Sequence, residues 1–291
     1  MKKNDMSGAY RVAHELLRDR LKDRAPEILR ELDEISEADV IVTRGEYDYI
    51  ENVLQQAGTP HTLLDPGQID DANLRPDQIV FVNCPGKFNP KGIRNLVNFV
   101  DQGGFLFTTD WALKHVLERA FPGVVEYNQN STRDAVVRVE VLDKEDPFLA
   151  SIMDSEDDPQ WWLEGSSYPI RILDADRVRV LVASRELGER YGESPVFITF
   201  DHGAGRVYHM ISHFYLQRTE TRTQRHASSS VGFVAQKGVP AQAMDKYNAM
   251  GADNMSTSEV ESAYVSRGMM SRVMWEKRKQ MKKMDRKKGG D

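Results

Sequence analysis

The segment 103–120 constrains the fold more than any other part of the sequence. A Gly-Gly pair precedes an apolar run, 105–109, whose aromatic and β-branched residues are typical of a buried strand. From Leu113 onward, apolar residues recur at the i, i+3, i+4 and i+7 positions of one helical face. Asp110 therefore stands at a strand-to-helix corner. Because open α/β folds bind their ligands at the carboxyl edge of the sheet, Asp110 becomes the centre of the candidate site.

Composition narrows the class of protein. The chain has 291 residues, of which 40% are hydrophobic and 29% charged, enough to bury a sizeable core. A net charge of −6 argues against binding nucleic acid over the whole surface. The single cysteine, Cys84, excludes an internal disulfide and a multi-cysteine zinc site. No apolar run approaches the roughly 20 residues of a membrane span, and no secretory signal is visible, so we expect a cytoplasmic protein.

Strand-like and helix-like segments alternate through the first half of the domain, which predicts βαβ units and a parallel sheet. The expected strands there are 39–43, 61–64, 78–82 and 105–109, with helices at 49–57 and 90–100. The second half is richer in strands, which we expect at 135–142, 178–183, 195–200 and 207–211. Between them, 184–194 looks like a polar connection, and Trp161-Trp162 looks like a lid or flank over the site.

The ends of the chain differ from its middle. Residues 1–37 read as a helical extension and 38–218 as the α/β domain, whereas 219–255 is polar enough to be a partly disordered linker. Residues 256–291 form a basic helix or tail whose methionines suit an adaptable binding surface. We expect a protein partner at the N-terminal helices and this basic tail. Nucleic acid ranks lower because no aromatic residues are interleaved with the basic ones.

Three stretches, 80–86, 103–111 and 195–213, carry a resemblance to a known family. In these three stretches, the region 38–216 resembles the class I glutamine amidotransferase-like superfamily. Within that superfamily it is nearest to the trehalose-utilisation-type branch and related uncharacterised members. The resemblance implies a flavodoxin-like α/β fold, a mostly parallel sheet with helices on both faces. It also implies that the corner after the central strand holds the nucleophile. The loop after the preceding strand would help to bind the oxyanion, and a histidine after the late strand would be the base.

The chain departs from that family pattern at its chemical centre. Asp110 stands where the family has its nucleophilic cysteine, and Trp111 follows where a small glycine is usual. His213 is succeeded by Phe214 and Tyr215 instead of completing a His-x-Glu pair. Glutaminase chemistry by the family's route is therefore not expected.

Several roles stay open for the residues at this corner. Asp110 can cap its own helix, bind a ligand or metal, or act as a covalent nucleophile; a carboxylate held by several N–H donors would have a depressed pKa. Cys84 is either a packed side chain or a nucleophile, which would need a nearby cation. Gly86 and Trp111 flank the same corner and join Cys84 and Glu164 as candidate ligand contacts.

His213 ends a strand and can meet Asp110 across the carboxyl edge, or serve as a core histidine bonded to the backbone. Glu164 is a possible third carboxylate. Asp110, His213 and Glu164 would suit a divalent metal, although no spacing motif supports one and no cofactor can be named.

Two functions follow. The leading interpretation is a non-glutaminase module that binds a small ligand or acts as a scaffold in a protein complex. The alternative is a hydrolase that uses Asp110 and His213, with or without a divalent metal. A nucleic-acid-associated factor is a third, less favoured class.

Overall fold

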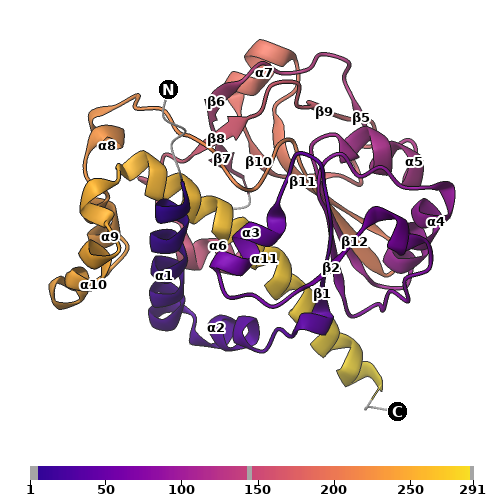
Figure 1. Cartoon of the computed structure of the whole chain (residues 1–291), viewed down its shortest axis with the longest axis horizontal. Coiled ribbons are helices and arrows are strands. Elements are labelled where there is room, and N and C mark those ends of the chain that lie inside the picture. Colours follow the sequence, from indigo (N-terminus) through magenta and orange to yellow (C-terminus); the bar gives the residue numbers. More distant parts are fainter. Residues whose placement is uncertain (1–5, 143–145, 289–291) are drawn as a thin grey trace.

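The computed structural model describes residues 6–142 and 146–288, and in these ranges the fold is α/β with one large mixed sheet (Figure 1). Its strand order is β2-β1-β3-β4-β12-β11-β10-β7. In that order the bounds are Thr62–Leu64, Val40–Thr43, Ile79–Val82, Phe105–Thr109, Gly205–Met210, Pro195–His202, Arg179–Ala183 and Glu140–Val141. The first five strands run parallel, and β11, β10 and β7 add on antiparallel. The carboxyl ends of β1, β3, β4 and β12 thus share one edge.

Four shorter strands pair outside this sheet, as β5 with β9 and β6 with β8. They span Val125–Tyr127, Ile170–Ile172, Ala135–Arg138 and Gln160–Leu163, respectively. The single strand expected at 135–142 is therefore divided between β6 and β7. Trp161 and Trp162 belong to β8 and are buried, so of the lid or flank expected for them only the flank fits. In the ladder with β6, Trp161 pairs with Val137 and Trp162 with Val136.

The helices of the described chain are α1 to α11, and 3₁₀ turns connect some of them. The bounds of α1–α7 are Ser7–Arg24, Pro26–Asp33, Ile50–Gln56, Pro90–Asp101, Glu118–Ala120, Pro147–Ile152 and Arg185–Tyr191. The bounds of α8–α11 are Gln224–Ala227, Ser230–Gln236, Met244–Ala249 and Thr257–Lys288. The polar connection expected at 184–194 is largely α7, because Ser184 caps its first turn and Gly192 ends it in a left-handed conformation.

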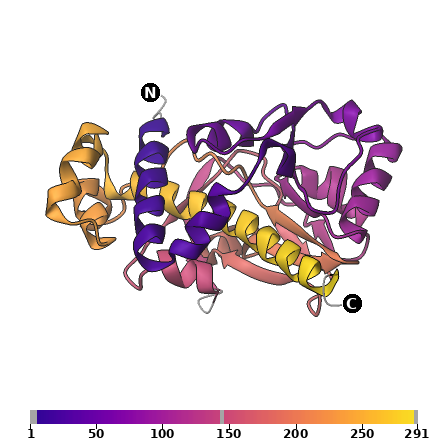
Figure 2. The same cartoon turned by 90° about the horizontal axis from the view of Figure 1, so that it is seen from below.

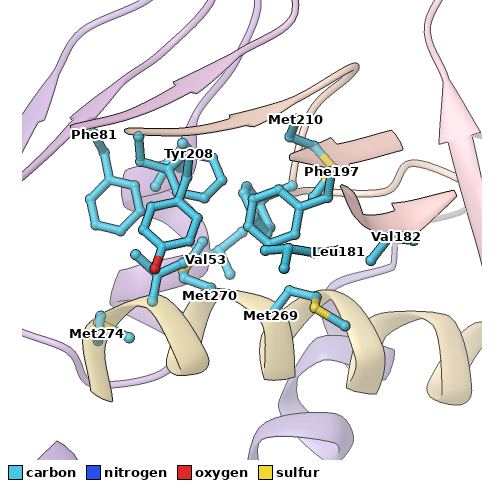
Figure 3. Packing of buried hydrophobic residues seen from close by; sticks show 14 of the residues in the cluster. Val53, Phe81, Leu181, Val182, Phe197, Tyr208, Met210, Met269, Met270 and Met274 are labelled. Carbon is cyan, nitrogen blue, oxygen red and sulfur yellow. The ribbon is translucent and has the colours of Figure 1, made fainter. Parts of the chain in front are cut away.

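The C-terminal helix α11 is a core element along much of its length. It runs beneath the sheet beside α1 (Figures 1 and 2). Figure 3 shows Met269 and Met270 of α11 below Phe197 and Tyr208 of the sheet, with Met274 farther along the helix on the side of Phe81; all three methionines are buried. The expectation that these methionines serve a partner-binding surface is therefore wrong for these three, since each is buried within the chain.

Residues 219–255 are helical over much of their length, which corrects the expectation of partial disorder. Thr223 and Ser229 cap α8 and α9 with their hydroxyl groups, and Phe233 packs edge-on against Tyr264 of α11. An ion pair of 2.6 Å between Arg225 and Glu261 fixes the same region. Its polar composition thus reflects helix caps and ion pairs.

Among the helices that the structure describes, none is long and apolar enough to cross a membrane.

Candidate functional site

Asp110 occupies a left-handed corner at the end of β4. Its φ is 45°, a conformation that costs a residue with a Cβ roughly 1–2 kcal/mol. The backbone N–H of Asp110 donates to the carbonyl of Met210 at 2.9 Å, which ties the corner to β12. The chain then enters a π-type turn, Leu113–Leu117, and α5. A sharp strand-to-helix corner of this kind projects its side chain at the carboxyl edge of a sheet.

The carboxylate of Asp110 does not cap its own helix. Its Oδ1 accepts a hydrogen bond from the backbone N–H of Tyr168 at 3.0 Å, and its Oδ2 accepts one from the Ser167 hydroxyl at 3.3 Å. Both donors belong to the loop before β9. Burial raises the pKa of Asp110 to about 7, although the charge of His213 and these hydrogen bonds oppose the rise. The depressed pKa expected for a carboxylate held by N–H donors is therefore wrong, because desolvation outweighs the donors.

His213 follows β12 and lies between two carboxylates. Its Nδ1 is 2.9 Å from Glu164 Oε2, and its Nε2 is 3.7 Å from Asp110 Oδ2. The buried Nε2 has no hydrogen-bond partner. Burial disfavours the imidazolium, but the carboxylate of Asp48, the neighbouring Cys84 side chain and the carboxylates of Glu164 and Asp110 outweigh it. The pKa of His213 therefore lies well above its usual value.

Cys84 is buried beside this pair. Its backbone N–H donates to the Thr109 hydroxyl at 3.2 Å. Burial raises the pKa of the Cys84 thiol to about 11, so the sulfur is a neutral thiol near pH 7 and a poor nucleophile. The possible ligand atoms of Cys84, Asp110 and His213 lie within 4.8 Å of one another, a set of soft and nitrogen donors that would suit Zn²⁺. The third possible ligand beside Asp110 and His213 is thus Cys84, where Glu164 was expected.

Asp48 also belongs to this polar cluster, although the sequence did not identify it as a candidate site residue. Its side chain is 1% exposed, and its two oxygens accept hydrogen bonds from the Thr109 hydroxyl at 2.7 Å and the Tyr49 N–H at 2.8 Å. Asp48 lies after β1, at the same carboxyl edge as Asp110. That position is the signal that could have found it, because parallel strands bring their carboxyl ends together. Ser167 and Tyr168 lie in an irregular loop and carried no such signal.

Aromatic rings cover the corner. Trp111 donates from Nε1 to the carbonyl of Ser166 at 2.7 Å, and its ring stacks on Tyr168 with centroids 5.6 Å apart. Tyr47 meets Trp111 edge-on at 5.2 Å, and Tyr127 stacks on the other side of Tyr168 at 3.9 Å. These rings therefore form a continuous aromatic cluster beside the Asp110 corner.

Gly86 and Trp162 have packing roles near the site. A Cβ at Gly86 would lie 2.9 Å from Val116 and 3.0 Å from Ala112, so glycine lets the Cys84 loop pack on the turn after Asp110. The φ of Gly86 is also positive, at 68°. Trp162 contacts His213 edge-on with centroids 6.3 Å apart, and in this limited sense the pair at 161–162 flanks the site.

Comparison with known proteins gives only remote structural likenesses. No family model and no curated protein matches the chain. A β-galactosidase from Bacillus circulans sp. alkalophilus is 13% identical, with a TM-score of 0.41 over 64% of this chain and 31% of its own. The carbohydrate deacetylase Agd3 is 9% identical, with a TM-score of 0.42 over 60% of this chain and 29% of its own. The cytoplasmic protein STM3548 from Salmonella typhimurium is 10% identical, with a TM-score of 0.43 over 75% of this chain and 99% of its own.

The chain thus spans about a third of the length of the β-galactosidase. At such identities and TM-scores, these likenesses assign neither a family nor an activity.

Proposed function

We propose that this chain is a hydrolase in which Asp110 and His213 form the acid–base pair. The observation that supports this most is the placement of His213. Glu164 holds its Nδ1 at 2.9 Å, while its Nε2 faces Asp110 at 3.7 Å without a hydrogen-bond partner. A ring fixed at one nitrogen and unengaged at the other is oriented for proton transfer.

With a pKa of about 7, Asp110 is partly ionised near neutral pH, and the raised pKa of His213 favours the imidazolium there. The imidazolium of His213 would donate a proton to the leaving atom of the substrate, and the Asp110 carboxylate would accept one from the attacking water. The bond between the reacting centre and the leaving atom breaks as the bond to the water oxygen forms. Burial makes both groups sensitive to a nearby reacting charge, which is typical of catalytic groups. Glu164 is a positioning residue in this scheme.

We also propose that the domain is flavodoxin-like and related to the class I glutamine amidotransferase-like superfamily, with Asp110 in place of the nucleophile. Support comes from the parallel order β2-β1-β3-β4-β12, the left-handed corner after β4 and the histidine after β12. The raised pKa of Cys84 argues against glutaminase chemistry at that residue. A binding or scaffolding role, a protein partner and a cytoplasmic location stay predictions from the sequence.

Activity assays on matched variants test the proposal. Wild type is screened against chromogenic esters, amides, glycosides and phosphate esters, and against L-glutamine. We expect Asp110→Asn and His213→Gln to lower turnover about 10²–10⁴-fold, and Glu164→Gln to lower it less. His202→Gln, at the far end of β11, should leave turnover unchanged.

Turnover that survives in Asp110→Asn would remove the acid–base assignment. Glutamine hydrolysis that Cys84→Ala abolishes would restore the family's cysteine chemistry. Tight ligand binding without turnover of any substrate would favour the binding module.

A further inference from the structure

A second polar group lies away from Asp110, at a cavity between the terminal helices and the turn after α3. The cavity has a volume of about 120 Å³. Much of its wall is apolar, contributed by Leu17, Leu21, Leu29, Leu32, Ile35 and Met274. Arg267 and Ser271 of α11 and His14 of α1 add polar atoms to this wall. The exposed residues Asp33, Gly58 and Pro60 also line it, which places its mouth at the surface.

Arg267 carries a buried charge without a counter-ion. Its side chain donates from Nη2 to the Thr59 hydroxyl at 3.3 Å, whereas its Nε and Nη1 have no hydrogen-bond partner. Within residues 6–142 and 146–288, no carboxylate forms an ion pair with it. Burial and the like charge of Arg18 lower the pKa of Arg267 to about 10, so the group is still charged near pH 7. A buried charge of this kind is costly unless something pairs with it.

Two further donors are unengaged at the same cavity. Ser271 lies one helical turn after Arg267 on the same face of α11, and its hydroxyl has no hydrogen-bond partner. The Nδ1 of His14 has none either. Burial, with the charges of Arg267 and Arg18, lowers the pKa of His14 to about 4, so this ring is neutral at pH 7. It can therefore offer one N–H group.

We propose that this cavity binds a small organic monocarboxylate, whose carboxylate pairs with Arg267 and Ser271 and whose apolar group lies against the leucines. The charge at the cavity favours a monoanion. Arg18 is already neutralised by Asp33, with nitrogen-to-oxygen distances of 2.6 and 3.2 Å, which leaves one uncompensated positive charge. Asp33 at the mouth would also repel a dianion.

The size of the cavity limits the apolar group. An apolar cavity of about 150 Å³ holds one benzene molecule, so about 120 Å³ suits a carboxylate with a chain of roughly four carbons. Because α1, α2, α11 and the turn after α3 all line the cavity, the ligand would join the terminal helices to the α/β domain. This inference does not depend on the proposed hydrolase.

Thermal unfolding of the full chain tests the site, with sodium butyrate replacing sodium chloride at constant ionic strength. We expect a saturable rise in Tm for wild type, since a ligand that binds only the folded state stabilises it. The rise should be absent in Arg267→Met. It should be retained in Arg11→Met, a control that changes an exposed arginine of the same helical layer.

Ser271→Ala keeps the charge and removes one donor, so calorimetry should show severalfold weaker butyrate binding. If Arg267→Met does not fold, the comparison of butyrate binding between Ser271→Ala and wild type tests the proposal instead. Three results would overturn the proposal: no effect of butyrate beyond that of chloride, an equal effect in Arg267→Met, or stabilisation by phosphate where butyrate has none. The first would mean that water alone occupies the cavity.

Discussion

The Asp110 corner and the Arg267 cavity treat buried charge in opposite ways. At the corner, His213 lies between Glu164 and Asp110, so the chain supplies both signs of charge within 3.7 Å. At the cavity, two nitrogens of Arg267 face no partner in the described chain. A buried charge that other residues of the chain neutralise can take part in proton transfer within the site. A charge that it leaves uncompensated points to a ligand from outside.

Helix α11 itself supplies the reference case for this comparison. Arg272 lies five residues after Arg267 and forms a buried ion pair with Asp146, with Nη2 2.7 Å from Oδ2. On the same helix, Arg272 therefore has a counter-ion, whereas Arg267 has none within the described residues. The difference comes from a neighbouring element, since Asp146, the N-cap residue of α6, brings a carboxylate to Arg272 and not to Arg267.

The largest effect should follow from breaking the compensated pair. We predict that Asp146→Ala lowers the free energy of unfolding by about 3–5 kcal/mol, because it removes the buried carboxylate that pairs with Arg272 and also the N-cap of α6. Urea unfolding measures this loss. Asp146→Asn keeps a cap oxygen and should cost less. A loss below about 1 kcal/mol in Asp146→Ala would mean that pairing inside the chain matters little for stability.

The second effect concerns Asp110 and pH. Its pKa rises from 3.8 to about 7 on folding, so the folded state holds the proton more tightly. The contribution to stability is therefore full below about pH 4 and is lost as pH rises toward about 7. We predict that Asp110→Asn removes this decline and gains about 1–3 kcal/mol near pH 8.

Urea unfolding at several pH values checks this prediction. Glu27→Gln, which changes an exposed carboxyl group, serves as the control. A difference between Asp110→Asn and wild type that stays constant from pH 4 to pH 8 would contradict the raised pKa.

The smallest effect should come from the uncompensated arginine. We predict that Arg267→Met raises the free energy of unfolding by about 1 kcal/mol in ligand-free protein, because an apolar side chain of similar length replaces an unpaired buried charge. Arg222→Met, which removes ion pairs with Glu186 and Glu220, should lower stability instead. If Arg267→Met instead lowered the free energy of unfolding by as much as Asp146→Ala does, the claim that Arg267 is an uncompensated charge would be contradicted.

Much of the central sheet was predictable because its strands are short apolar runs with clear ends. The runs at 39–43, 78–82 and 105–109 correspond to β1, β3 and β4. The helix α6 was missed, although Asp146-Pro147 is a good start signal, because the helix has only six residues. The burial of α11 was missed because its first half mixes serine, arginine and methionine, a pattern that does not reveal which face meets a sheet.

The site was predictable only where strand ends marked it. Asp110, Cys84 and His213 all follow strands of one parallel set, and topology alone brings them together. Asp110's partners Ser167 and Tyr168 come from a loop whose path depends on tertiary packing. Arg267 gave no signal in the sequence either, since an arginine on a basic helix is usually exposed.

The protonation of His213 tests the central claim most directly and needs no substrate. NMR of ¹⁵N-histidine-labelled protein, titrated from about pH 5 to pH 9, would follow the ring nitrogens in wild type and in Asp110→Asn. We predict that His213 is an imidazolium at neutral pH, with a pKa well above its usual value that falls when the Asp110 charge is removed. A ring that is already neutral near pH 6 in wild type, or one that Asp110→Asn leaves unchanged, would contradict an acid–base pair at this corner.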